Sequence, residues 1–336
     1  MKKTDYFSLK FDNDKLIFLD QTKLPFKEEY VETDDYDRIA LAIERLEVRG
    51  APAIGITAAY ALALAVKNSD ESNLKINFET AYNRLEKTRP TAINLFVVLE
   101  EMKNVFEQGS DNMYQKLLNK AIEIHNDDID KCRKIGLNGL KIFLRKSNIL
   151  THCNTGKLAT GGDGTAFNVI KTGFENGLVN YVYADETRPL LQGLRLTAFE
   201  LSKNGIPFSV LNDSSSSALL KSGKVDFVIV GADHIALNGD TANKIGTYNL
   251  AVSCAYHEIP FYVAAPTTTI DKKIATGDEI KIEFRNKNEI TSPNGIKLAP
   301  EIPEAYTPAF DVTPSHLITG IITEEGVFTF PYNFLK

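Results

Sequence analysis

The sequence predicts an α/β protein in which a small N-terminal domain of short strands and helices precedes a Rossmann-like domain with a doubly wound parallel sheet. Three observations predict this class. From about residue 142, apolar runs alternate with helical stretches, as in a parallel sheet covered on both faces. The first third instead shows a few short strands followed by helices. At 336 residues the chain is long for one core, so we expect two domains, residues 1–127 and 128–336.

The N-terminal elements follow from the period of their apolar residues. Segments 7–11 and 16–19 alternate apolar and polar side chains, which predicts two strands. The stretch DDY at 34–36 offers caps for the helix that follows it. Further helices are predicted over residues 57–66, 78–85, 94–105 and 114–125.

The second part reads as strands joined by helices. Five apolar runs predict parallel strands, over residues 147–150, 181–183, 208–211, 227–230 and 261–263. The stretches between them predict helices over residues 165–172, 190–203, 215–221 and 241–257. Ligands of such sheets bind beyond the carboxyl ends of the strands, near the point where strand order reverses. The residues after each strand are therefore the first candidates for a functional site.

Four consecutive strand ends carry reactive or charged side chains: Cys153, the DETR stretch at 185–188, the NDS stretch at 212–214, and Asp233. A free cysteine is more often a small buried hydrophobe, but Cys153 lies just past its apolar run among polar neighbours, which favours function. Asp233 follows the apolar run FVIV, where poor solvation would raise its pKa and let it donate a proton. A cap or turn aspartate is the alternative. His152 adjoins Cys153 and receives no role.

Three cations are candidates for anion binding. Arg49, Arg89 and Lys244 each lie among small, apolar or turn residues rather than on a charged helical face. In the stretch KLATGGDGTAFNVI at 157–170, several glycines directly precede a predicted helix. The free backbone N–H groups at such a helix start favour an anion such as phosphate. A plain glycine turn explains that stretch almost as well.

Composition excludes several classes of function. A formal net charge of −6 argues against a nucleic-acid binder, which uses a basic face. The three cysteines, Cys132, Cys153 and Cys254, are odd in number and widely spaced, which predicts a reducing compartment and no metal site. The uncharged segment 51–66 is interrupted by proline and glycine and reads as a buried helix rather than a membrane span. The N-terminal stretch lacks the apolar core of a signal peptide, so we expect a cytoplasmic protein without membrane partners.

Several long motifs together resemble the methylthioribose-1-phosphate isomerase family of the methionine salvage pathway. The matching stretches are VRGAPAIG, TRPTAINLF, THCNTGKLAT, YADETRPLLQGLRLTAFEL, VIVGADHIALNGDTANKIGTYNLAV, IPFYVAAP and TPAFDVTPSHLITGIITEEGV. They occur in order and cover most of the chain. The resemblance implies a homodimer that acts on a small-molecule sugar phosphate, with neither a metal nor an organic cofactor.

The resemblance also implies which residues form the site. The family's catalytic cysteine falls on Cys153 in HCN, and its catalytic aspartate falls on Asp233 in GAD. Its substrate contacts fall on Arg49, Gly50, Ala51, Arg89, Gln192, Asn243 and Lys244. Gln192 and the neighbours of Arg49 come from the resemblance alone.

Three stretches depart from the family pattern. His234 stands where the family usually has arginine, NDSSSSALL occupies residues 212–220, and GGDGT replaces a more usual G-Y-G-T-like stretch. The catalytic positions are kept, so the departures concern the pocket for the 5-substituent of the sugar. The substrates to distinguish are 5-methylthioribose 1-phosphate, 5-deoxyribose 1-phosphate and ribose 1,5-bisphosphate.

The implied reaction turns 5-methylthioribose 1-phosphate into 5-methylthioribulose 1-phosphate. Because phosphate on the anomeric oxygen blocks spontaneous ring opening, an acid must assist departure of the ring oxygen before hydrogen moves from C2 to C1. We expect Asp233 to donate that proton and Cys153 to act as the base, while a hydride-like transfer stays open. Two other classes remain: a non-catalytic regulatory subunit related to the translation-initiation exchange factor, and a nicotinamide dehydrogenase, whose glycine fingerprint this chain lacks.

Overall fold

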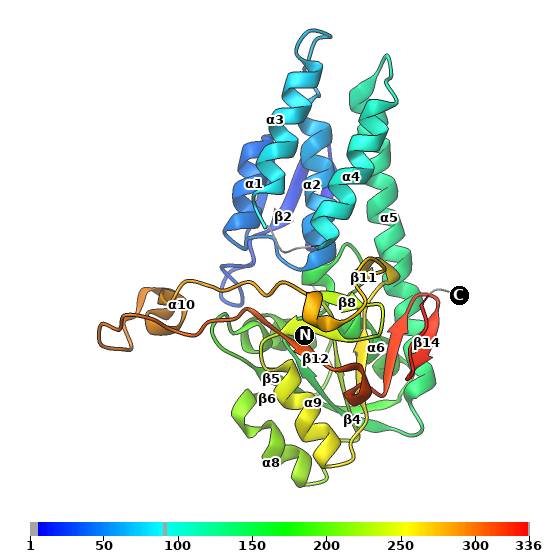
Figure 1. Cartoon of the computed structure of the whole chain (residues 1–336), viewed down its shortest axis with the longest axis vertical. Helices are drawn as coiled ribbons and strands as arrows, with labels where there is room; N and C mark the ends of the chain where they lie inside the picture. Colours follow the sequence, from blue (N-terminus) through cyan, green and yellow to red (C-terminus); the bar gives the residue numbers. More distant parts are fainter. Residues whose placement is uncertain (1–5, 90–92, 335–336) are drawn as a thin grey trace. The chain divides into compact units, whose positions relative to one another are not determined.

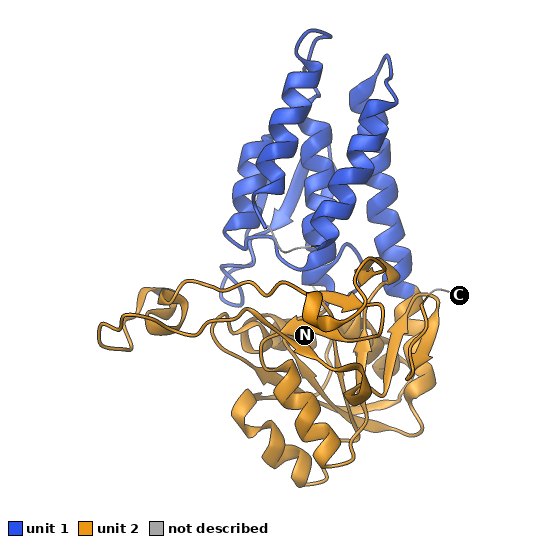
Figure 2. Cartoon of the chain, in the orientation of Figure 1, with its two compact units in different colours: residues 1–133, 156–164 blue, residues 134–155, 165–336 orange. Residues whose placement is uncertain are grey.

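The computed structural model describes residues 6–89 and 93–334 (Figure 1). The N-terminal MKKTD and the centre of the TRPTAINLF motif, residues 90–92, lie outside these ranges. The chain forms two compact units, residues 1–133 with 156–164 (unit 1) and residues 134–155 with 165–336 (unit 2) (Figure 2). The predicted boundary between residues 127 and 128 falls inside helix α5 (Met113–Gly139), and the division into domains 1–127 and 128–336 stays a prediction.

Unit 1 contains a small antiparallel sheet and a group of helices. The strands are β1 (Leu9–Asp12), β2 (Lys15–Leu19) and β3 (Tyr30–Thr33), in the order β1-β2-β3. The helices are α1 (Tyr36–Glu44), α2 (Ala51–Ala65), α3 (Leu74–Glu86), α4 (Ile93–Glu107) and most of α5. The two predicted strands and the predicted helices are confirmed, although α5 runs well past residue 125.

The core of unit 1 surrounds α2. This helix is apolar on all sides and almost entirely buried, which explains why the segment 51–66 carries no charge. Gly55 lets α4 approach closely, since a Cβ at this position would lie 3.0 Å from the Asn94 carbonyl oxygen. Within the described ranges, no helix combines the length and the apolarity that a membrane crossing requires.

The segment 156–164 belongs to unit 1 although it follows a strand of unit 2. Ser8 Oγ donates a hydrogen bond to the Thr160 carbonyl oxygen, and Gln21 Nε2 donates one to the Leu158 carbonyl oxygen, each 2.7 Å long. Polar side chains near the N-terminus thus bind the backbone of the segment 156–164.

Unit 2 is built on a seven-stranded sheet. Its strands are β4 (Ser147–His152), β5 (Val179–Glu186), β6 (Phe208–Asn212), β7 (Phe227–Val230), β10 (Phe261–Ala264), β13 (Gly320–Thr323) and β14 (Gly326–Thr329). Their order is β14-β13-β10-β7-β4-β5-β6, and all neighbours are parallel except β13 and β14. The five predicted strands are confirmed.

Helices cover both faces of this sheet, as the sequence predicts. Ile149 joins a core cluster with α6 (Ala166–Glu175) and α7 (Ala198–Lys203). Its neighbour Leu150 joins a different cluster with α8 (Ser216–Lys221) and α9 (Thr247–Tyr256). Successive residues of a strand point to opposite faces, so the two clusters make the sheet doubly wound.

A second sheet in unit 2 corrects one prediction. The strands β8 (His234–Ala236), β9 (Thr241–Lys244), β11 (Ile270–Asp271) and β12 (Phe310–Thr313) form a sheet in the order β11-β8-β9-β12. The helix predicted over 241–257 is therefore wrong at its start, because residues 241–244 are paired on both sides by β8 and β12. Pairing with β8, just before it in the chain, and with the distant β12 overrides the local helical pattern here.

Candidate active site

The predicted reactive residues emerge at the point where strand order reverses. The chain runs from β4 through β5 to β6 and then crosses to β7, which lies on the other side of β4. In register, Leu150 of β4 pairs with Val228 of β7. Cys153 is the first residue after β4, and Asp233 is the third after β7. The fold therefore brings these two segments to neighbouring strand ends, where sheets of this kind bind ligands.

The backbone at Cys153 takes a conformation that is costly for a cysteine. Its φ is +62°, in the left-handed region, and only 8% of the residue is exposed. Such strain persists where the surroundings enforce it, and it is enriched at active sites. The other two cysteines lie inside helices α5 and α9 without a positive φ. Burial raises the pKa of Cys254 to about 12 and that of Cys132 well above its usual range.

Residues at the start of α7 hold the turn that follows β4. Thr197 Oγ1 donates a hydrogen bond of 2.5 Å to the Cys153 carbonyl oxygen. Asn154 Nδ2 donates one of 2.7 Å to Glu200 Oε1, and both side chains are buried. The left-handed turn is therefore fixed by buried hydrogen bonds rather than by glycine.

Asp233 lies at an irregularity between β7 and β8. Its N–H donates to the Ala242 carbonyl oxygen at 2.9 Å, while His234 is also in register with Ala242. Asp233 and His234 thus both lie opposite Ala242, which is the arrangement of a β-bulge. Bulges change the direction of side chains and are frequent next to active sites. His234 Nε2 lies 3.2 Å from Asp271 Oδ2, and burial lowers the pKa of His234 despite that carboxylate.

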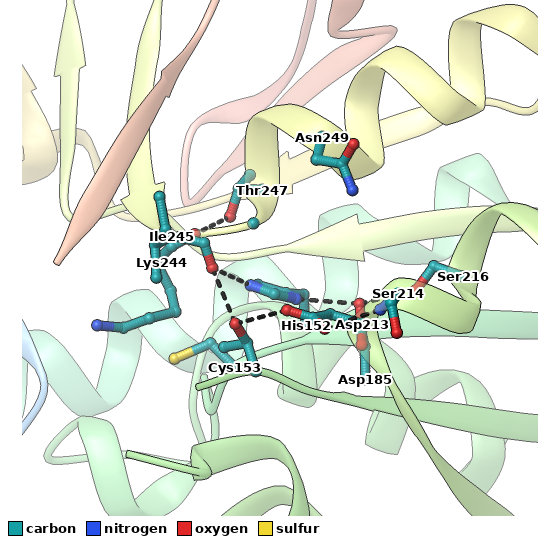
Figure 3. A network of polar contacts seen from close by, with 12 residues as sticks. His152, Cys153, Asp185, Asp213, Ser214, Ser216, Lys244, Ile245, Thr247 and Asn249 are labelled. Carbon is teal, nitrogen blue, oxygen red and sulfur yellow. Dashed lines mark hydrogen bonds and ion pairs between the residues drawn. The ribbon is translucent and has the colours of Figure 1, made fainter. Parts of the chain in front are cut away.

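Two predicted substrate contacts lie on β9. Lys244 is buried, and its ammonium donates a 2.9 Å hydrogen bond to the Ala309 carbonyl oxygen and lies 4.9 Å from the centre of the Phe310 ring. Asn243 is also buried, and its Nδ2 donates to Thr247 Oγ1 at 3.0 Å. In Figure 3 the side chains of Lys244 and Cys153 both extend away from a polar network behind them.

Gln192 precedes a π-helix (Gly193–Thr197), a local widening that is frequent at functional sites. The helix predicted over 190–203 thus begins with this turn before α7. Gln192 is buried, and its Oε1 accepts no hydrogen bond from the described part of the chain. Gly193 is needed for packing, because a Cβ there would lie 2.0 Å from the Asp185 carbonyl oxygen. An unsatisfied buried acceptor is costly, so a ligand that donates to it is favoured.

The remaining predicted contacts lie in unit 1. Arg49 and Arg89 are half-buried, and Ala51 is the first residue of α2. Gly50 caps that helix with a φ of +91°, and a Cβ there would lie 2.4 Å from the Ala159 carbonyl oxygen. Glycine is required at this position for both reasons. A role for these residues beside Cys153 and Asp233 stays a prediction.

The glycine-rich stretch at 157–170 already holds an anion of the chain's own. Gly161 N–H donates a 2.7 Å hydrogen bond to Oδ2 of Asp128, which lies on α5. Burial raises the pKa of Asp128 to about 6, against the opposing effect of the Gly161 and Gly162 N–H groups. In the same region, Tyr60 OH lies 3.0 Å from His125 Nδ1. The Gly161 N–H thus already binds a buried carboxylate of the chain itself, which the sequence did not reveal, and a phosphate at the start of α6 stays a prediction.

A buried polar network lies behind Cys153 (Figure 3). His152 is fully buried, with Nδ1 3.1 Å from Asp185 Oδ2 and Nε2 3.0 Å from the Ile245 carbonyl oxygen. Burial alone would lower the pKa of His152, but the hydrogen bond and charge of Asp185, helped by the Ile245 carbonyl and Asp311, raise it overall. Asp185 belongs to β5 itself rather than to the loop after it. Within residues 6–89 and 93–334, no group of three His, Cys, Asp or Glu side chains is arranged to hold a metal ion.

Comparison with known proteins confirms the resemblance of the motifs. The model of the initiation factor 2 subunit family matches residues 47–330. The methylthioribose-1-phosphate isomerase of Caldicellulosiruptor saccharolyticus is 51% identical over 96% of this chain and 96% of its own length. The crystal structure of 5-methylthioribose 1-phosphate isomerase from Pyrococcus horikoshii has a TM-score of 0.92 at 38% identity, covering 98% of this chain and 94% of that one.

A structure with a different name is also similar. The translation initiation factor eIF-2B subunit delta from A. fulgidus has a TM-score of 0.87 at 40% identity, covering 98% of this chain and 97% of that one. The chain therefore belongs to the initiation factor 2 subunit family and, within it, to the sugar-phosphate aldose–ketose isomerases.

Proposed function

We propose that the chain converts 5-methylthioribose 1-phosphate into 5-methylthioribulose 1-phosphate, a step of methionine salvage. The observation that carries the proposal is the left-handed Cys153 at the end of β4, beside the strand whose loop carries Asp233. The names of the relatives from C. saccharolyticus and P. horikoshii support the choice of substrate.

The first step opens the sugar ring. Protonated Asp233 gives its proton to the ring oxygen as the bond between that oxygen and C1 breaks. The positive charge that develops on C1 is shared with the phosphate ester oxygen. General acid assistance of this kind contributes about 10²–10⁴-fold, and spontaneous opening is blocked by the phosphate.

The second step moves hydrogen from C2 to C1. The Cys153 thiolate removes the C2 proton and leaves an enol between C1 and C2. The thiol then returns this proton to C1 while the C2 hydroxyl proton passes to the Asp233 carboxylate. The ketose forms, and both groups regain their starting states.

The substrate is held by cations and amides. Lys244, with Arg49 and Arg89, neutralises the phosphate, because cations in sheltered surroundings bind phosphate strongly. Gln192 and Asn243 bind sugar hydroxyls, and the open Oε1 of Gln192 supports this role. Gly50 and Ala51 complete the contacts through the start of α2.

Turnover by purified variants tests the assignment. Cys153→Ser and Asp233→Asn are each expected to reduce kcat by at least about 10³-fold while substrate binding, measured by calorimetry, changes little. Cys254→Ser, which alters a buried cysteine away from the site, is the matched control. Near-normal kcat in either site variant would remove that residue from the chemistry.

Isotope retention separates the two routes for hydrogen. With deuterium at C2 of the substrate, transfer through the thiol allows exchange with water, so part of the label is lost from C1 of the product. In a hydride-like transfer, the C2 hydrogen moves to C1 with its electron pair, and Asp233 takes only the C2 hydroxyl proton. Complete retention at every extent of reaction would contradict the thiolate as base.

The 5-substituent requires its own assay. His234 and the segment 212–220 depart from the family pattern, so 5-deoxyribose 1-phosphate and ribose 1,5-bisphosphate are the alternative substrates. We expect the highest kcat/KM for the methylthio sugar. A higher value for either alternative sugar would reassign the substrate and leave the reaction unchanged.

A regulatory subunit is the alternative of another class, favoured by the similarity to the A. fulgidus eIF-2B subunit delta. The presence of Cys153, Asp233 and Lys244 at the positions of the family motifs supports the enzyme instead. Stable assembly with other initiation-factor subunits, without turnover of any of the three sugars, would favour the regulatory role.

We also propose a cytoplasmic homodimer. Exposed large hydrophobic side chains gather along the segment 284–306, namely Phe284, Ile290, Ile296, Leu298 and Tyr306. Exposed apolar patches of this kind mark interaction surfaces. Analytical ultracentrifugation is expected to give twice the chain mass of 37.3 kDa, and a monomer at micromolar concentration would contradict the dimer.

A further inference from the structure

His152 joins three strand ends at the switch point. It is the last residue of β4, its Nδ1 faces Asp185 on β5, and its Nε2 faces the carbonyl of Ile245, the residue after β9. The residue after His152 is Cys153, and the residue before Ile245 is Lys244. One buried ring thus connects the backbone of the proposed base to the backbone of a proposed phosphate ligand.

The partners of the ring determine its protonation. A carbonyl oxygen only accepts, so Nε2 must carry a proton to bind Ile245. An ionised carboxylate also only accepts, so Nδ1 carries a second proton toward Asp185. Ser216 Oγ donates a 3.0 Å hydrogen bond to the same Asp185 oxygen. Together these contacts describe an imidazolium paired with a carboxylate inside unit 2.

The ring of His152 is closely packed on one side. A Cβ at Gly246 would lie 2.9 Å from His152 Cε1 and 3.2 Å from Nε2, so the ring packs directly on the start of α9. Thr187 Oγ1 lies 3.3 Å from the Ile245 carbonyl oxygen and 3.0 Å from Asp213 Oδ2. The network therefore continues from β9 to the loop after β6.

The charged groups near the ring come from several strands. Asp185 on β5 is in direct contact, and Asp311 on β12 acts through space. Asp311 accepts from the N–H of Gly246 at 2.7 Å. It also interacts electrostatically with Lys244 on β9. Asp185 and Asp311, together with Asp213 through Thr187, thus surround the ring, and nearby carboxylates of this kind allow an imidazolium to remain buried.

We propose that His152 is a positioning residue, held as an imidazolium between Asp185 and the Ile245 carbonyl, that fixes Cys153 and Lys244 relative to each other. The inference rests on the proposed function of these two residues. The bond to Asp185 anchors the end of β4, and through it the left-handed turn of Cys153. The bond to Ile245 anchors the turn that follows Lys244.

The charge is tested on the native chain by NMR of protein labelled with ¹⁵N-histidine. The chain has five histidines, His125, His152, His234, His257 and His316. Single variants of the other four assign the His152 signal by elimination. We expect both ring nitrogens to be protonated between about pH 6 and 8. A neutral His152 ring in this range would overturn the proposal.

Two substitutions of His152 each keep one of its two hydrogen bonds and remove the other. In His152→Gln the amide nitrogen reaches the position of Nε2 and keeps the Ile245 bond, while the Asp185 anchor is lost. We expect kcat to fall by about 100-fold with KM nearly unchanged, since a misplacement of about 1 Å has an effect of this size. In His152→Asn the amide nitrogen replaces Nδ1 and keeps Asp185, so KM is expected to rise by about tenfold.

The exposed His316 provides the matched control, and His316→Gln is expected to leave both constants unchanged. A purely structural role predicts equal losses in the two His152 variants, and this result would refute the proposal, as would normal kinetics in both. If the unpaired Asp185 prevents folding, the double variant His152→Gln/Asp185→Asn removes the buried charge and is assayed instead. If the native chain turns over none of the three sugars, the proposed function fails, while the NMR measurement still decides the state of the ring.

Discussion

Replacing Asp128 by asparagine removes a buried charge from unit 1 and keeps an oxygen that can accept the Gly161 N–H. The carboxyl pKa is about 6 in the folded chain, against 3.8 for an unperturbed aspartate, because burial disfavours the charged form. This direction is opposite to that of a salt-bridged aspartate. The folded state binds the proton more tightly, so ionisation of Asp128 destabilises it, and the free energy of unfolding falls as the pH rises through this range.

The magnitude follows from the shift. A difference of about two pKa units corresponds to about 3 kcal/mol, reached in full above the folded pKa and absent below the unfolded one. At pH 4.5 the unfolded aspartate is already largely ionised, so about 1 kcal/mol of this cost is present there. Between pH 4.5 and 7.5 the asparagine variant should therefore gain about 2 kcal/mol relative to the native chain.

The assay is urea unfolding at several pH values, followed by circular dichroism and by tyrosine fluorescence, because the chain has no tryptophan. The amide can also change the free energy of unfolding by an amount that does not depend on pH. This amount cancels when only the pH dependence of the difference in unfolding free energy between variant and native chain is compared. Asp127→Asn is the control, since Asp127 is exposed on the same helix and pairs with Lys131. A difference between Asp128→Asn and the native chain that stays flat, or that shrinks with rising pH, would refute the buried-charge argument.

Three further tests, which use five variants, concern particular contacts. Cys153→Gly should be more stable than Cys153→Ala by about 1 kcal/mol in thermal unfolding, because only alanine is strained at a φ of +62°; equal stabilities would mean that the turn relaxes. Gly50→Ala should lose at least about 2 kcal/mol. Gly109→Ala, with a φ of +68° but no atom within 4 Å of the new Cβ, should lose less, and a reversed ranking would contradict the close contact with Ala159. Gln192→Met should raise KM by about tenfold without lowering the melting temperature, because the substituted oxygen has no partner within the described residues and its burial is a cost to the native chain; an unchanged KM would remove Gln192 from the binding site.

The sheet of unit 2 was predictable because its central strands, such as β7, are buried on both faces. Runs such as FVIV at 227–230 are apolar throughout, and few other structures require this pattern. By contrast, β9 reads TANK, and its strand conformation comes from pairing with β8, which lies just before it in the chain, and with β12, which lies far away in sequence. The strand β3 was missed for a different reason, because it alternates exposed and half-buried residues.

The candidate site was predictable where it follows from topology and hidden where it depends on tertiary contacts. Cys153 and Asp233 stand directly after apolar strands, so the general rule for such sheets finds them. The role of His152 depends on partners 33 and 93 residues away, and no local pattern reveals them. Asp128 lies in the stretch HNDDIDK, where it resembles any solvated acid of a helix. Only the fold shows that this carboxylate faces glycine N–H groups.

The return of residues 156–164 to unit 1 means that the order of synthesis differs from the order of completion. During translation, the partners of Ser8 and Gln21 are supplied only when Leu158 and Thr160 have been added. By that time β4 of the other unit has already been made. Unit 1 therefore stays incomplete until residues 156–164, which follow the first strand of unit 2, have been synthesised. For the same reason, no single truncation of the chain would yield unit 1 with all of its segments and nothing else.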